Sequence, residues 1–263
     1  MTNPWKRRIQ RAEELTALHP AVAEILRFYL QIARFHEAAQ AKLAITPAPS
    51  LSAPDSLPSR APHLVSEFAP FLSLVEVNGP SFLAGVARDL RVGGAGSQSE
   101  LLDACWSRTD TAPSQPQEFL ARAFLQPYAE SLRLRAALNL NGYNYPLCPF
   151  CSRRAGLGVL RPLGEGAARS LVCAFCLAEW EFRRIVCPAC GEEDNRKLPV
   201  YSAEEFEYIR VDACDSCKTY IKAVDLTKNG RAEPVVDEIA AAALDLWAQE
   251  RGYSKLQPNL VGM

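Results

Sequence analysis

The sequence is poor in several features that would point to a function. Its 263 residues include three histidines and two methionines, and 29 basic residues nearly balance 30 acidic ones, so the formal net charge is -1. A dedicated nucleic-acid-binding protein usually carries a clear positive excess, and the balance therefore disfavours that class. The longest apolar stretches are interrupted by charged residues and fall short of the roughly 18 residues that a membrane helix needs. We expect no membrane span.

The beginning of the sequence lacks the apolar segment of a secretory signal, because residues 1–15 are highly charged. The basic cluster at residues 6–8 is followed by further charged residues and by no hydrophobic segment, so it indicates a basic helical turn rather than a twin-arginine signal. We therefore expect a cytoplasmic protein.

Cysteine is plentiful and regularly spaced. Eight of the nine cysteines form four Cys-x-x-Cys pairs between residues 148 and 217. In a reducing compartment such pairs indicate metal ligands before disulfides. Two intervening residues let a tight turn direct both sulfur atoms at one ion, and two such turns complete a tetrahedral four-cysteine site. The candidate metal ligands are Cys148, Cys151, Cys173, Cys176, Cys187, Cys190, Cys214 and Cys217.

The spacing of the pairs favours one grouping of these cysteines. Residues 152–172 separate the first pair from the second, and residues 191–213 separate the third from the fourth; each segment is long enough for a hairpin. The shorter segment 177–186 then joins two modules. We predict that the first two pairs form one site and the last two another. A nested arrangement, in which the middle pairs share one ion and the outer pairs another, stays open, as does a thiol–disulfide role.

Tetrahedral thiolate ligation suits both zinc and iron, so the spacing does not choose between these metals. The three histidines, His19, His36 and His63, lie far upstream and are expected to be ordinary surface or core residues. The ninth cysteine, Cys105, is expected to be a small buried hydrophobe. Closed four-cysteine coordination leaves no position for a catalytic water. We therefore predict that the protein is not an enzyme, and we name no catalytic residue.

The part of the chain before the cysteines has helical periodicity. Apolar residues recur at helical spacing over residues 21–33, and shorter or longer helical patterns cover residues 64–77, 80–90, 100–109 and 117–140. Pro127 is expected to kink or divide the last of these helices. Residues 46–62 are rich in proline, serine and alanine, which predicts an extended linker.

The character of the sequence changes near Tyr143, after a turn signal. Runs of Val, Ile, Phe and Tyr at residues 206–211 and 220–224 predict strands. A last helix is expected from Pro234 to a stop at Gly252, with acidic residues complementing its dipole. The predicted fold class is α plus small β: an all-α helical N-terminal domain followed by two rubredoxin-like or zinc-ribbon metal modules, each with four cysteines, and a C-terminal helix. The predicted domains are residues 1–143, 144–186 and 187–263.

These motifs resemble the formate dehydrogenase accessory protein family, the FdhE proteins. The resemblance covers residues 145–260 and rests on the four knuckles in this order, on Glu179-Trp180, and on Tyr220-Ile-Lys222 after the last knuckle. It implies a cytoplasmic, non-catalytic maturation factor, or chaperone, with iron at the cysteine sites. Such a factor binds the catalytic subunit of a molybdenum- or tungsten-dependent formate dehydrogenase and is needed for its assembly or activity.

The sequence departs from this pattern after the knuckles. A glycine is expected there because it eases the turn that points backbone N–H groups at sulfur. It is present only at Gly191, while Ser152, Leu177 and Lys218 stand at the other three positions. The resemblance therefore leaves the local geometry of those three knuckles open.

Two other functions compete with the accessory role. A zinc-ribbon nucleic-acid-binding protein is disfavoured because residues 148–228 hold equal numbers of basic and acidic residues, and thiolate ligands add negative charge. A rubredoxin-like electron carrier would use Phe150, Phe175 and Trp180 to shield an iron, but these residues equally suit the core of modules too small to fold without metal. The oligomeric state stays open.

Overall fold

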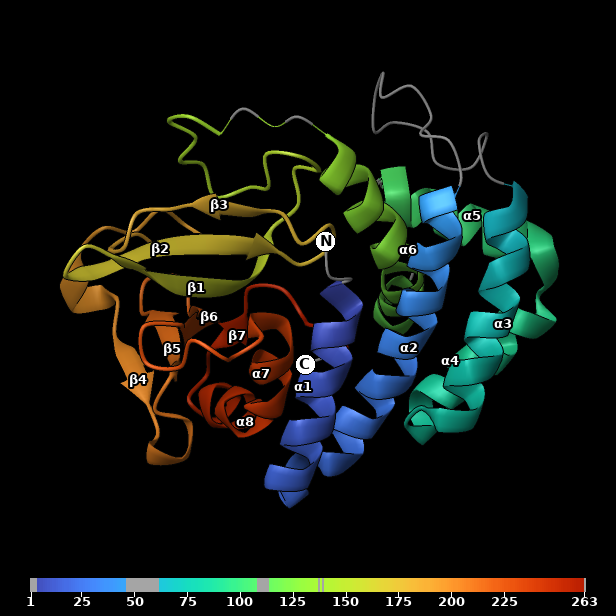
Figure 1. Ribbon diagram of the computed structural model, residues 1–263, viewed down its shortest axis with the longest axis horizontal. Coiled ribbons are helices and arrows are strands. Elements are labelled where there is room, and N and C mark those ends of the chain that lie inside the picture. Colours follow the sequence, from blue (N-terminus) through green and yellow to red (C-terminus); the bar gives the residue numbers. More distant parts are fainter. Residues whose placement is uncertain (1–3, 46–61, 108–113, 137, 139, 263) are drawn as a thin grey trace. The chain divides into compact units, whose positions relative to one another are not determined.

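Figure 1 shows the computed structural model of the protein, which describes residues 4–45, 62–107, 114–136, 138 and 140–262. The predicted linker at 46–62 lies outside these residues except for Pro62, which begins a helix. The chain forms two units. One, which we term the sheet unit, takes the chain up to Arg27 and again after Ala136; the other, the helical unit, is Phe28–Ala136. Among the described helices, none is long and apolar enough to cross a membrane.

The helical unit confirms the predicted helical character of the first half of the chain. It contains most of α2 (Ala23–Ile45), then α3 (Pro62–Asn78), α4 (Ser81–Val92), α5 (Gly94–Ser107) and α6 (Gln115–Arg135). Three fully buried phenylalanines form the centre of its core. The ring centroid of Phe124 lies 4.9 Å from that of Phe68 and 5.7 Å from that of Phe71. Aromatic burial of this kind supplies much of the driving force for helix packing.

Helix α6 is not divided by its internal proline. It begins after Ser114, whose backbone N–H donates to Gln117 Oε1 at 3.2 Å, and it runs through Pro127 to Arg135. The alternative in which Pro127 divides the helix is therefore wrong. Every residue from Phe119 to Glu130 is buried, and the packing of this stretch outweighs the one hydrogen bond that proline cannot make.

The sheet unit contains one seven-stranded sheet (Figure 1). Its strands are β1 (Ala155–Leu163), β2 (Gly166–Cys173), β3 (Glu179–Glu181), β4 (Val200–Ser202), β5 (Ile209–Cys214), β6 (Thr219–Asp225) and β7 (Ser254–Lys255). The order across the sheet is β3-β2-β1-β6-β5-β4, with β7 pairing β6. Hairpin neighbours pair antiparallel, as the ribbon spacing predicts.

The two cysteine modules share this sheet because β1 and β6 pair in parallel. Gly158 stands opposite Ala223 at this junction. A Cβ atom at position 158 would lie 3.2 Å from the Cβ of Ala223, so glycine allows the two strands to approach. The predicted boundary between residues 186 and 187 therefore separates two segments of a continuous sheet, and the three predicted domains stay a prediction.

The C-terminal helix is interrupted. It consists of α7 (Pro234–Ala240) and α8 (Ala242–Glu250), and Ala241 between them has φ -88° and ψ 38°. The carbonyl oxygens of Glu238 and Ala241 accept hydrogen bonds from Lys222 Nζ on β6, which satisfies carbonyl groups at the break. The predicted single helix is thus two helices held to the sheet by a lysine.

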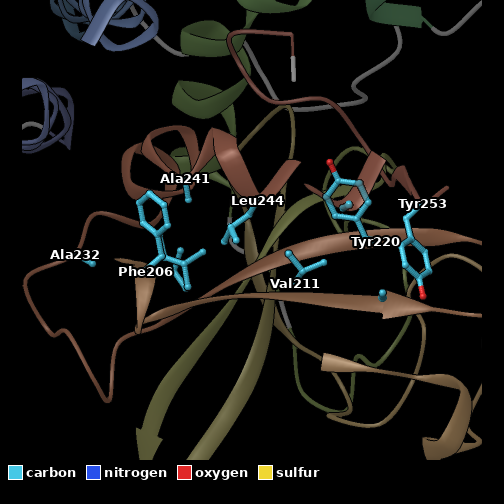
Figure 2. Close-up of a cluster of buried hydrophobic side chains, with 11 residues drawn as sticks. Phe206, Val211, Tyr220, Ala232, Ala241, Leu244 and Tyr253 are labelled. Carbon is cyan, nitrogen blue, oxygen red and sulfur yellow. The ribbon is translucent and has the colours of Figure 1, made fainter. Parts of the chain in front are cut away.

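The core between this sheet and α8 is apolar. Figure 2 shows Val211 of β5 and Tyr220 of β6 facing Leu244 of α8, with Ala232 and Tyr253 at the two ends of the cluster. Alternate residues of β5 and β6 point to this side, and the residues between them point to the other face of the sheet.

Helix α1 (Pro4–Leu18) belongs to the sheet unit because it contacts α7. Arg11 donates to both carboxylate oxygens of Asp237, and Tyr208 donates to the same carboxylate at 2.8 Å. Asp237 also accepts from the backbone N–H of Glu233, the type of contact that the predicted helix-terminal role implies. The bidentate ion pair between Arg11 and the fully buried carboxylate of Asp237 explains why α1, which is distant in sequence, packs on α7 as part of the sheet unit.

Candidate metal centres

The four Cys-x-x-Cys turns close in the same way. The backbone N–H of the first cysteine donates to the carbonyl five residues later: Cys148 to Arg153 at 2.8 Å, and Cys173 to Ala178 and Cys187 to Glu192, both at 2.9 Å. The fourth turn is closed by the pairing of Cys214 with Thr219 in the β5–β6 hairpin. This closure is a property of the local chain, and it directs both sulfur atoms of each turn to one side.

The residue after each second cysteine adopts a left-handed backbone conformation. Its φ is 55° at Ser152, 55° at Leu177, 54° at Lys218 and 79° at Gly191. The three departures from glycine therefore do not change the geometry of the turns. Each non-glycine residue carries strain of about 1–2 kcal/mol in this region, which the turn and the surrounding contacts must offset.

The first group consists of Cys148, Cys151, Cys173 and Cys176. Their sulfur atoms all lie within 4.8 Å of one another, with separations of 3.5 Å between Cys148 and Cys176 and 3.4 Å between Cys151 and Cys173. A tetrahedron of sulfur atoms about 2.3 Å from a zinc ion has edges of about 3.8 Å. The separations are close to that value and far longer than the about 2.05 Å of a disulfide bond.

The second group consists of Cys187, Cys190, Cys214 and Cys217. Its sulfur atoms also lie within 4.8 Å of one another, with 3.7 Å between Cys187 and Cys217 and 3.7 Å between Cys190 and Cys214. The two groups differ in burial. Cys190 is exposed and Cys217 is half-buried, whereas the first group has one half-buried cysteine and three buried ones.

The grouping is the one that the spacing favours, and the nested arrangement does not occur. Backbone N–H groups point at sulfur as well: those of Phe150, Phe175 and Ala189 each lie 3.4 Å from the sulfur of the first cysteine of their turn. Four sulfur donors with N–H···S bonds in tetrahedral reach fit a divalent or trivalent ion, and both zinc and iron suit such a donor set.

Without a bound cation the four thiols of a group do not all ionise: hydrogen bonds from neighbouring thiols lower the pKa of Cys148, whereas the pKa values of other cysteines are raised. Burial raises the pKa of the Cys187 thiol to about 12 and raises that of Cys173 well above its usual range. Four crowded sulfur atoms cannot all ionise on their own, because like charges at such separations disfavour one another. A metal ion stabilises the thiolates, so its binding releases protons and contributes to folding.

Side chains around the first group fix its turns. The guanidinium of Arg153 stacks over the ring of Phe175 at 3.9 Å and so links the two turns of this group. Trp180 donates from Nε1 to the carbonyl of Tyr145 at 2.9 Å, just before the first turn. The role of Trp180 is thus to hold the segment leading into the site.

Arg169 connects the two groups. It extends from β2, is almost fully buried, and donates to the carbonyls of Arg183 and Val186 in the segment that leads into the third turn. Its Nη2 lies 3.2 Å from Asp212 Oδ2 on β5. Burial lowers the pKa of Arg169 from its usual value, although Asp212 opposes that shift. This buried arginine was not identified from the sequence, because nothing in its local pattern distinguishes it from a solvated strand residue.

A buried group of four charges lies among β6, β7 and the helices α7 and α8. Lys222 of β6 contacts Glu238 of α7 and Asp245 of α8, and Lys255 of β7 contacts the same two carboxylates. The hydroxyl of Tyr220 donates to Asp245 at 2.7 Å. The sequence motif contains Tyr220 and Lys222, but their carboxylate partners lie in other elements and have no local signal.

The residues expected to stand apart from the sites do so where their side chains are described. His36 is fully buried in the helical unit, with Nε2 2.7 Å from the carbonyl oxygen of Ala123. His19 packs its ring 5.6 Å from that of Phe206. Cys105 is buried in α5. The side chain of His63 lies outside the described residues.

Comparisons with known proteins agree with this arrangement. The family described as FdhE, C-terminal domain, matches residues 185–261. A protein named Protein FdhE homolog from Aquifex aeolicus is 32% identical over 145 residues, which are 55% of this chain and 51% of that protein. Its namesake from Pseudomonas aeruginosa is 34% identical over 122 residues, 44% of this chain and 39% of that one. The chain thus spans about half, or less, of the length of these curated relatives.

The similarity to a solved structure extends further. The crystal structure of the FdhE protein from Pseudomonas aeruginosa matches 98% of this chain and 95% of that chain, with a TM-score of 0.70 and 26% identity. The structural similarity therefore also covers the helical part of the chain, which the family match at residues 185–261 does not reach.

Proposed function

We propose that this chain is an accessory factor of formate dehydrogenase, because residues 185–261 match the FdhE C-terminal domain and the fold is similar to that of an FdhE protein. In this proposal it binds the catalytic subunit of a molybdenum- or tungsten-dependent enzyme in the cytoplasm and is needed for the assembly or activity of that subunit. It acts as a binding protein and catalyses no reaction itself.

The observation that carries the proposal is the pair of closed four-cysteine groups within one sheet that matches the FdhE fold. A closed tetrahedral site offers no ligand position to a substrate or to a catalytic water, which supports a binding role over a hydrolytic one. A chain of this composition also carries no positive excess to attract a nucleic acid.

We propose that the eight cysteines hold two metal ions, iron or zinc. A bound ion supplies a covalent-like cross-link between two turns and, if it is iron, a one-electron redox couple. The residues of the chain do the rest: N–H groups stabilise the thiolates, Arg153 joins the two turns of the first group, and Arg169 joins the first hairpin to the second group.

Two measurements test the accessory role. The tagged chain, expressed in its own host, is expected to co-purify with the catalytic subunit of formate dehydrogenase, and deletion of its gene is expected to abolish formate oxidation. Complementation with Cys173→Ser or Cys214→Ser, each of which removes a buried ligand, should fail, whereas Cys105→Ser should complement. Intact formate oxidation in the deletion strain together with no co-purification would contradict the proposal.

A further inference from the structure

A cavity of about 110 Å³ lies beside the second cysteine group. It opens on the face of the sheet opposite α7 and α8, because Arg210 and Asp212 line it while their neighbour Val211 points into the helix-covered core. The segment 184–189, which leads into and includes most of the third turn, forms another wall. Strand β4 forms the rim.

The rim is an edge of the sheet. Strand β4 ends the order β3-β2-β1-β6-β5-β4, and in the described part of the chain no strand pairs with its outer side. The N–H of Ala213 donates to the carbonyl of Pro199 at 3.0 Å, so the alternation of an antiparallel ladder turns the backbone groups of Val200 and Ser202 away from β5. Such outward N–H and C=O groups are a template for an added strand.

Large apolar side chains are exposed at this rim. Ile185 is 56% exposed and Val200 is 55% exposed, and both line the cavity. Leu198, Pro188 and Leu256 continue the apolar lining inward. Exposed aliphatic residues around a concave site are typical of a surface that a partner covers.

The mouth of the cavity is also positive. Three arginines line the cavity, whereas its one carboxylate, that of Asp212, lies 3.2 Å from Arg169 and 2.8 Å from Arg210. Arg184, at the exposed end, donates to the carbonyl of Ala167 at 3.4 Å and has no carboxylate partner among the described residues. The buried Nε of Arg169 likewise has no hydrogen-bond acceptor there. When an ion is bound, the thiolates of Cys187 and Cys214 offset part of this charge inside the cavity, so an acidic group of a ligand is favoured at Arg184, at the exposed end.

We propose that this groove binds an extended acidic segment of a partner polypeptide. The segment adds a strand to the outer edge of β4, inserts one aliphatic side chain between Ile185 and Val200, and pairs an adjacent aspartate or glutamate with Arg184. Backbone pairing supplies affinity, while the cavity and the arginine select the sequence. The identification of the partner as the catalytic subunit of formate dehydrogenase rests on the proposed function; the chemistry of the groove does not.

The first test measures binding of the metal-loaded full chain to that catalytic subunit. Val200→Asp and Arg184→Glu are expected to weaken binding by at least about tenfold. The matched controls are Leu163→Asp, which changes a 68% exposed leucine outside the cavity, and Arg251→Glu, directly after the end of α8; both variants should bind as the unchanged chain does. Metal content and thermal unfolding midpoint are measured for every variant. If the catalytic subunit binds the groove variants and the unchanged chain equally well, the groove is not its binding site, while the accessory role stays intact.

The second test uses a probe that does not depend on the client. A labelled peptide of strand-favouring residues with Asp-Leu-Asp at its centre is compared by fluorescence anisotropy with Lys-Leu-Lys and Asp-Gly-Asp versions. The first is expected to bind the full chain at least about tenfold more tightly than either comparator, and Arg184→Glu should remove its advantage over Lys-Leu-Lys. Equal affinities of the three peptides, or no binding of the Asp-Leu-Asp peptide up to about 1 mM, would refute the proposal that the groove binds an acidic segment. Selective peptide binding by a chain that does not bind the catalytic subunit would keep the groove and refute the client assignment.

Discussion

Replacing Lys222 by methionine is expected to destabilise the sheet unit strongly while all eight cysteines remain. Lys222 has no exposed side-chain surface, and its Nζ lies 2.5 Å from Asp245 Oδ2 and 3.0 Å from Glu238 Oε1. Lys255 contacts the same two carboxylates, so two buried cations balance two buried anions. Methionine keeps most of the apolar stem and removes the charge.

The size of the effect follows from the imbalance. After the substitution, Lys255 alone faces two carboxylates from which water is excluded, and the carbonyls of Glu238 and Ala241 lose their donor. Removing one partner of a buried ion pair costs about 3–5 kcal/mol, because the remaining charge is neither solvated nor paired. The exposed pair of Lys218 and Asp215 provides the comparison, since exposed pairs contribute about 0–1 kcal/mol.

The measurement is urea unfolding of metal-loaded protein, with metal content determined for each variant. Lys222→Met should lose about 3–5 kcal/mol and Lys218→Met less than about 1 kcal/mol. Adding Asp245→Asn to Lys222→Met restores the charge balance, so the double variant should be more stable than the sum of the two single changes predicts. The reasoning is refuted if Lys222→Met is no more damaging than Lys218→Met, or if the two changes are additive.

Three further predictions concern a turn, acid stability and metal release. Gly191 has a φ of 79° and open space around an added Cβ, so Gly191→Ala should destabilise the protein by about 1–2 kcal/mol. Gly85 in α4 also has open space, and Gly85→Ala should stabilise the protein by about 0.5–1 kcal/mol in the same thermal scan. Equal effects of the two substitutions would contradict the backbone strain assigned to position 191. Burial would raise the pKa of Glu238, but the two buried lysines lower it to about 2. The contribution of this carboxylate to the free energy of unfolding is therefore complete above its unfolded-state pKa of about 4.3, and it is lost as the pH falls towards 2. Urea midpoints between about pH 5 and 2 should therefore fall less steeply for Glu238→Gln than for the unchanged chain, and parallel curves would count against this. A chelator should remove metal from the second cysteine group first, because Cys190 is exposed. A single release rate for both ions would contradict this order, and so would a fast phase of release that persists in the Cys190→Ser variant.

The arrangement of the cysteines could be predicted from the sequence because it depends on local geometry. Each Cys-x-x-Cys turn is closed by contacts within five residues, and the segments between the pairs are the right length for hairpins. The left-handed residues are the exception. Ser152 and Leu177 adopt the backbone that glycine prefers, because closing the turn requires it.

The connections between elements could not be predicted, because each depends on a partner far away in the chain. Gly158 and Ala223 join two hairpins into one sheet, and Arg11 ties α1 to Asp237. A basic residue on an amphipathic helix gives no sign of which carboxylate it will meet. For the same reason Lys222 could be noted as part of a motif while its buried partners stayed unknown.

Metal analysis of the full chain, purified without oxygen from its own host, tests the two proposed centres most directly. Elemental analysis should find two ions per chain, one for each cysteine group, and X-ray absorption should find four sulfur neighbours around each. Iron would add visible thiolate-to-iron absorption bands and zinc would leave the protein colourless, and either result satisfies the account. A folded chain without bound metal, or ions coordinated by nitrogen or oxygen, would contradict it.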